Sequence, residues 1–130
     1  MNRPLPHDVL DRIALERLHF ARAPQAFFEA WKRGASIVGA EWFGDGTRTD
    51  LQHAANRWEL RPNVLMLNDA LGVLSGGQRL FLSAMVSFYD PREGGAMLRR
   101  CGFKGLADLG DFDLERRKVI ADLLLHYTGW

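Results

Sequence analysis

One stretch decides the fold: residues 74–90 read Leu74-Ser75-Gly76-Gly77-Gln78-Arg79-Leu80-Phe81-Leu82-Ser83-Ala84-Met85-Val86-Ser87-Phe88-Tyr89-Asp90. On a helical wheel at about 100° per residue, the polar side chains of Arg79, Ser83, Ser87 and Asp90 fall in one narrow stripe. Apolar side chains fill most of the remaining circumference, which is typical of a helix surrounded by protein or lipid. The run is shorter than the roughly 20 apolar residues that a membrane span requires. The stretch therefore predicts a helix over 76–89, buried at the centre of an all-α fold.

The start of this helix carries its own signal. Ser75 and Gln78 form an S-x-x-Q capping box, in which each side chain is expected to bind a backbone N–H of the first turn. The run 74–78 is also identical to the signature sequence of the ABC-type ATPases, a resemblance that covers five residues. In that family the motif faces the γ-phosphate of ATP bound to the opposite subunit. Because the chain has no G-x-x-x-x-G-K-[ST] phosphate loop, we interpret the motif as a helix cap and predict no nucleotide cofactor.

Helical spacing and end signals elsewhere predict a bundle of about six helices with orthogonal or irregular packing, in a single domain over 1–130. Pro24 is expected to begin a second helix, because proline suits the first turn. Residues 35–43 fit either a helix or a short extended piece, and 64–67 alone could be a strand. The remaining helical segments are expected over residues 7–22, 24–34, 50–60, 62–71, 91–101 and 112–127.

Composition argues against several classes of function. The chain has 17 basic and 16 acidic residues, a net charge of +1. The signs are also balanced locally, with eight of each over 1–60 and seven of each over 90–130. No segment has the basic excess that drives binding to nucleic acid or to an anionic membrane. The chain has one cysteine, and residues 1–6 lack an apolar signal core, so we expect a cytoplasmic protein.

Candidate catalytic and metal-binding residues are scattered. The four histidines, at 7, 19, 53 and 126, form no H-x-x-x-H or H-E-x-x-H pattern, so no metal site is predicted. Cys101 has basic neighbours, but it lies near a predicted helix C-terminus, and a structural role is the simpler interpretation. The loop 44–50 is interpreted as a turn followed by a helix cap. No nucleophile, base and orienting group can be drawn together, which argues against an enzyme.

The last predicted helix shows an anomaly. Apolar side chains cover most of its circumference, so its own domain must wrap it or it must present a second apolar face outward. Arg116 and Arg117 also fall within the apolar arc, where arginine is tolerated if it stacks or meets a carboxylate. Aromatic residues beside aliphatic ones are typical anchors of protein interfaces. The interface residues expected from this pattern are Leu124, Tyr127, Trp130, Arg116 and Arg117.

These observations predict a non-catalytic cytoplasmic protein-interaction module or assembly subunit, docking on another protein or on a second copy of itself. The alternative is a helical module associated with nucleic acid. The motif Gly102-Phe103-Lys104-Gly105 resembles the glycine hairpin of helix-hairpin-helix DNA-binding modules, although its glycines are spaced G-x-x-G where that hairpin has G-x-G. In this alternative the phosphate contacts come from Arg99, Arg100, Lys104 and Lys118, although the acidic residues between them offset their charge.

Overall fold

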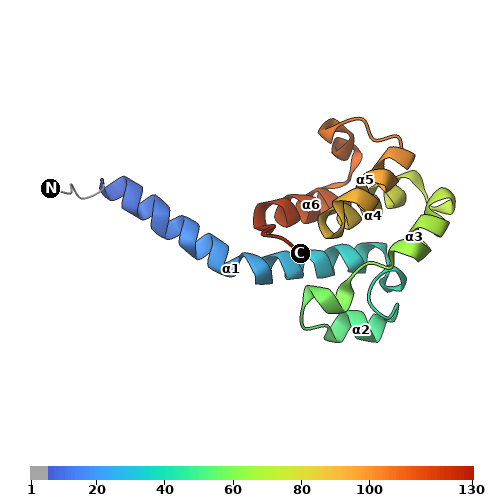
Figure 1. Cartoon of the computed structure of the whole chain (residues 1–130), viewed down its shortest axis with the longest axis horizontal. Helices are drawn as coiled ribbons and strands as arrows, with labels where there is room; N and C mark the ends of the chain where they lie inside the picture. The colour runs from blue at the N-terminus through green and yellow to red at the C-terminus, as the bar shows by residue number, and fades with distance from the viewer. Residues whose placement is uncertain (1–5) are drawn as a thin grey trace.

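The structure is a computed structural model that describes residues 6–130, and it is all-α (Figure 1). Within that range the β pairing is limited to an isolated bridge between Phe43 and Pro62. No helix in the described part of the chain is both long enough and apolar enough to cross a membrane. The α-helices are α1 His7–Val38, α2 Arg48–His53, α3 Val64–Ala70, α4 Gly76–Tyr89, α5 Pro91–Arg100 and α6 Leu114–His126. Short 3₁₀ helices are η1 Ala40–Trp42, η2 Arg57–Leu60, η3 Leu71–Val73 and η4 Leu106–Asp111.

The central helix is confirmed with the expected bounds. α4 buries Phe81, Leu82 and Met85 completely, whereas Phe88 is only half-buried. Its polar stripe is also covered: Ser83 is fully buried, and its hydroxyl donates to the carbonyl of Arg79 at 2.7 Å. A serine can be buried in this way because its own helix satisfies the hydroxyl.

The capping box of α4 forms only in part. The hydroxyl of Ser75 accepts the backbone N–H of Gln78 at 3.3 Å, as expected. The side-chain amide of Gln78 instead donates to the carbonyl of Val38 at 3.4 Å. Half of the box therefore caps α4, while the other half ties α4 to the end of α1.

The first two predicted helices are in fact one, and this corrects the sequence interpretation. α1 runs through Pro24 and changes direction near its middle (Figure 1). A proline inside a helix removes one hydrogen bond and bends the helix, but it need not end it when both flanks are helical. Gly34 does not end α1 either, because it is a packing position: a Cβ there would lie 2.8 Å from the Cε of Met85. The helix ends at Gly39, where φ is +114°.

The next two predicted helices are shorter than expected. The predicted helix over 50–60 is divided, because the side chain of Asn56 accepts the N–H groups of Trp58 and Glu59 and begins a separate 3₁₀ turn. The predicted helix over 62–71 becomes α3 and η3, and Val64 lies in α3 rather than in a strand. The loop 44–50 is a turn followed by a cap, as predicted, since the hydroxyl of Thr47 accepts the N–H of Asp50 at 3.0 Å.

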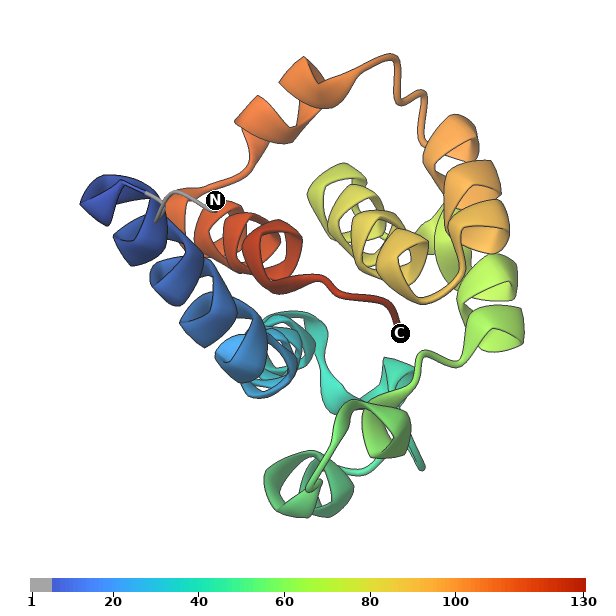
Figure 2. The same ribbon diagram turned by 60° about the vertical axis from the view of Figure 1, so that its left-hand side comes forward.

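The helices pack in two pairs around an aromatic core. α6 lies along α1, α5 lies along α4, and α4 also contacts α1 and α6 (Figure 2). Trp31 of α1 is fully buried, and its indole N–H donates to the carbonyl of Leu60 at 2.8 Å. The rings of Phe27, Phe43 and Trp130 lie within 6.0 Å of its ring centre. These contacts cover the C-terminal half of α1, and the rest of the domain packs around it.

Candidate interaction surface

The N-terminal half of α1 leaves the domain. Residues 7–22, here called the arm, extend beyond the other helices (Figure 1). Every buried residue of α1 lies at or after Ala23. The exposed side chains of the arm nevertheless include four large apolar ones, Leu10, Leu15, Leu18 and Phe20. The arm is thus a helix that exposes large apolar side chains to solvent.

One apolar stripe joins the arm to the covered half of α1. Val9, Ile13, Phe20, Phe27 and Trp31 are separated by four or seven residues, so they fall on one side of the helix. The domain covers Phe27 and Trp31, which are 2% and 0% exposed, whereas Phe20 is 59% exposed. The stripe therefore continues past the point where the domain stops covering it.

The end of α6 adds a second set of exposed apolar side chains. Val119 and Leu123 are buried on the side that faces the domain. Leu124 and Leu125 are 70% and 60% exposed, and Tyr127, directly after the helix, is also exposed. The pattern of this helix allowed either full cover by its own domain or a second, outward apolar face, and in the structure the domain wraps only part of its apolar circumference.

His19 connects these two sets. Its Nε2 lies 2.9 Å from the carbonyl oxygen of Leu125, and its ring stacks on His126 with ring centres 5.1 Å apart. The base of the arm and the end of α6 are therefore neighbours, although more than 100 residues separate them in sequence. The arm–α6 surface is defined here by Leu10, Leu15, Leu18, Phe20, Leu124, Leu125 and Tyr127.

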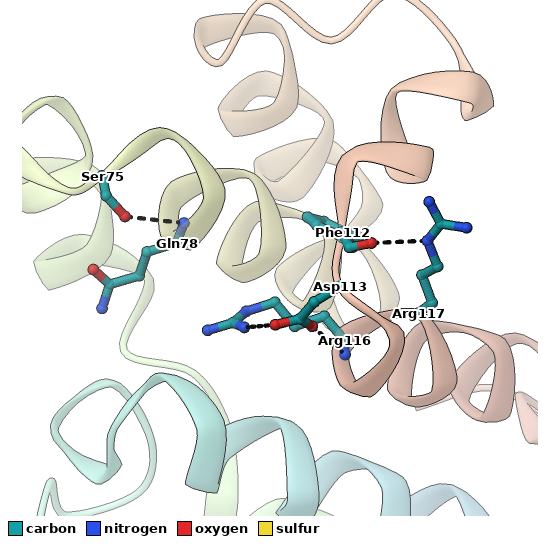
Figure 3. Close-up of polar contacts among 6 residues, drawn as sticks. All are labelled: Ser75, Gln78, Phe112, Asp113, Arg116 and Arg117. Atoms are coloured by element: carbon teal, nitrogen blue, oxygen red, sulfur yellow. Dashed lines mark hydrogen bonds and ion pairs between the residues drawn. The ribbon is translucent and has the colours of Figure 1, made fainter.

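Two of the residues expected at an interface are occupied within the chain instead. The guanidinium group of Arg116 pairs with the carboxylate of Asp113 at 2.6 Å and lies over the ring of Phe81, 5.8 Å from its centre. Arg117 donates to the carbonyls of Phe112, at 2.8 Å, and Gly110 (Figure 3). Both arginines hold the turn between η4 and α6.

Trp130 also lies differently from the rest of the expected set. Its ring is half-buried and packs edge-on against Trp31, Tyr89 and Trp58, with ring centres 4.7, 5.0 and 6.0 Å apart. The guanidinium carbon of Arg57 lies 5.8 Å from the centre of the same ring. Trp130 therefore contributes to the core, while Leu124 and Tyr127 remain on the exposed surface.

The structure does not gather the basic residues of the nucleic-acid alternative into one patch. Arg99 and Arg100 end α5, whereas Lys118 lies on α6, and these helices lie on opposite sides of α4 (Figure 2). Arg100 is bound to the carbonyl and side-chain oxygens of Asn68 at 3.1 and 3.3 Å. Lys104 lies in the loop after α5, where its backbone N–H binds the carboxylate of Asp108 at 2.6 Å.

The hollow in front of the signature-like motif is partly acidic. Ser75, Gly77 and Gln78 line it together with Asp111, Asp113 and Arg116. The carboxylate of Asp113 already neutralises Arg116, and Asp111 adds a second negative charge to the lining of the hollow. A triphosphate would meet repulsion from these carboxylates. The geometry thus favours the helix-cap interpretation.

The other residues considered for a catalytic or ligand-binding role contact partners within the chain. Cys101 is half-buried, and its Sγ lies 3.5 Å from the hydroxyl of Ser83. The hydroxyl of Thr47, and then its backbone N–H, bind the carboxylate of Asp45 and lower its pKa. Over residues 6–130 no three His, Cys, Asp or Glu side chains are grouped so that they could hold a metal ion. A groove between α1 and α6, about 710 Å³ in volume, is lined by charges of both signs, including Glu29, Lys32, Glu115 and Lys118.

Comparison of the chain with protein-family models, with curated proteins and with solved structures finds no match. Function is therefore argued from the geometry of the arm–α6 surface. Sequence reasoning found the α6 part of this surface but missed the arm. A signal was present in Arg17, which falls within the apolar arc of the first helix and suits a solvent-facing position better than a core.

Proposed function

We propose that this chain is a non-catalytic, cytoplasmic protein-interaction module or assembly subunit that docks through its arm–α6 surface. The observation that carries the proposal is the continuation of the buried stripe of α1 into an uncovered arm, next to the exposed leucines of α6. Groups of exposed apolar side chains mark interaction sites in soluble proteins.

The composition of the surface supports the proposal. Phe20 and Tyr127 supply aromatic rings, and the other residues of the surface are leucines. Interface cores are enriched in aromatic residues and depleted of charged ones, and a few such residues carry most of the binding energy. Polar residues of the arm border the apolar side chains, which gives the surface the polar rim of a typical interface.

Site-specific photo-crosslinking in the cells that make the protein tests the proposal. A photoreactive phenylalanine analogue replaces Phe20 in one variant and Leu124 in a second. The matched control carries the analogue at Val73, which is 87% exposed and lies in η3, away from the arm–α6 surface. We expect an adduct of discrete mass at positions 20 and 124 and none at 73. Absence of adducts at both test positions, or equal labelling at all three, would refute the proposal.

A further inference from the structure

The arm itself indicates what covers it. We infer that the partner of the arm is a second copy of this chain, with the two arms packed side by side in opposite directions. The inference rests on the proposed function and names its partner.

The arm needs cover because little within its own chain supports it. It has 16 residues, which makes it about 24 Å long. Most helical stability in proteins comes from packing an apolar face rather than from helix propensity. Within the described chain, tertiary contacts hold the base of the arm at His19, while the other residues of the arm are exposed or half-buried. A partner that covers the stripe would stabilise the helix as it binds.

The charges along the arm favour the antiparallel direction. Asp8 and Asp11 lie near its N-terminal end, and Arg17 and Arg22 lie toward its base. Two arms side by side in the same direction would bring their two acidic ends together and their two basic ends together. In opposite directions, the acidic end of each arm lies beside the basic end of the other, which gives complementary charge.

A pair of residues beside the stripe fixes the register. Arg12 and Glu16 are four residues apart, so they lie on the same flank, one turn from each other. In an antiparallel pair with a two-fold axis beside residue 14, residues on the same flank meet across the interface, so Arg12 of each copy meets Glu16 of the other. Neither side chain forms an ion pair within residues 6–130. The four-residue spacing of Arg12 and Glu16 thus supplies two equivalent ion pairs across the two-fold axis, as an isologous dimer requires.

The same register joins the apolar stripes. With the axis beside residue 14, Val9 of one arm lies near Phe20 of the other, and the stripe of each arm covers that of its partner. Because the stripe continues to Phe27 and Trp31 in the core, the dimer extends an existing packed face rather than creating a separate one.

Sedimentation equilibrium on the full chain tests the partner. We expect a monomer–dimer equilibrium, with Phe20→Glu raising the dissociation constant about tenfold or more. Arg12→Glu and Glu16→Arg should each weaken the dimer, because each places like charges opposite one another. An equimolar mixture of these two variants should associate again, since one arm then carries two acids at these positions and the other two bases. The mixture serves as the folding control, because unfolded variants could not restore each other.

Disulfide crosslinking tests the direction. Val9→Cys and Phe20→Cys are made in separate chains, each with Cys101→Ser, and mixed under mild oxidation. A disulfide requires Cα atoms within about 7 Å. Antiparallel arms should crosslink the Val9→Cys chain to the Phe20→Cys chain, whereas parallel arms would crosslink each variant to itself.

The results of these experiments distinguish a failure of the inferred dimer from a failure of the proposed function. A chain that stays monomeric at high concentration, or that crosslinks only in the parallel sense, overturns the inference. If photo-crosslinking at position 20 then yields an adduct with a different protein, the interaction function still stands. If position 20 and position 124 both give no adduct, the function fails as well. An adduct with twice the mass of the chain supports both.

Discussion

The two halves of α1 share one apolar stripe but differ in what covers it. The half after Ala23 packs Phe27, Phe28 and Trp31 into the core, whereas the half before it leaves Leu10, Leu18 and Phe20 exposed. Apolar periodicity therefore shows that a helix has a face to bury, but not what buries it. In this chain the domain covers one half, and we propose that a second copy covers the other.

Replacing one phenylalanine in each half gives the largest contrast. Phe27 and Phe20 are seven residues apart on the same side of α1, and they are 2% and 59% exposed. Phe27→Ala should lower the free energy of unfolding by about 3–5 kcal/mol, because it removes a buried ring and leaves a cavity. Phe20→Ala should change it by less than about 0.5 kcal/mol at dilutions where the chain is monomeric. Chemical denaturation measures both, and similar losses at the two positions would show that the arm is covered within the monomer.

Pro24 lies where the two halves join, and its replacement probes how independent they are. Proline supplies no N–H for the carbonyl of Phe20, one turn earlier, and costs up to about 3 kcal/mol relative to alanine inside a helix. Pro24→Ala should therefore slow amide hydrogen exchange in residues 9–22 while leaving exchange in α4 unchanged. Equal slowing in both regions would mean that the arm and the domain unfold as one unit.

Adjacent glycines in α5 repeat the contrast between covered and open faces on a smaller scale. A Cβ on Gly94 would lie 2.3 Å from the backbone nitrogen and Cα of Ser87 in α4. A Cβ on Gly95 would meet nothing closer than the guanidinium group of Arg99, at 3.7 Å. Gly94→Ala should destabilise by about 1–3 kcal/mol, because the helices must separate. Gly95→Ala should stabilise by about 0.5–1 kcal/mol through helix propensity. Thermal unfolding of the two variants checks the opposite signs.

Local signals in the sequence predicted local structure well. The serine before α4 caps its helix, as its position indicated, and the bounds of α4 followed from its apolar circumference. In the structure, aspartates also cap α5 and α6. The sequence did not predict which helix faces pack against each other. Pro24 has the sequence signal of a helix start, although the structure shows helix on both sides of it. The partners of Trp130 in the core come from three distant segments of the chain. The exposure of the arm could not be predicted either, because an apolar stripe that packs on its own domain and one that packs on a partner have the same sequence pattern.

The smallest expected effect concerns the segment between α5 and α6, which, like the arm, has little core cover but is held by local hydrogen bonds. η4 buries none of its residues. The backbone N–H groups of Lys104 and Gly105 donate to the carboxylate of Asp108 at 2.6 and 3.3 Å, and they lower its pKa in that order of importance.

A carboxyl whose pKa is lower in the folded state stabilises the protein above its unfolded pKa, near 3.9, and this contribution is lost as the pH falls through the folded value. The melting temperature of Asp108→Asn should therefore lie below that of the wild type at neutral pH, and the two should converge as the pH falls below the unfolded value and through the lowered pKa of the folded state. Asp69→Asn, at an exposed aspartate of α3, controls for the general loss of one negative charge. A difference between wild type and Asp108→Asn that persists unchanged at acid pH would show that local hydrogen bonds to this carboxylate do not hold the segment, and that it needs cover as the arm does.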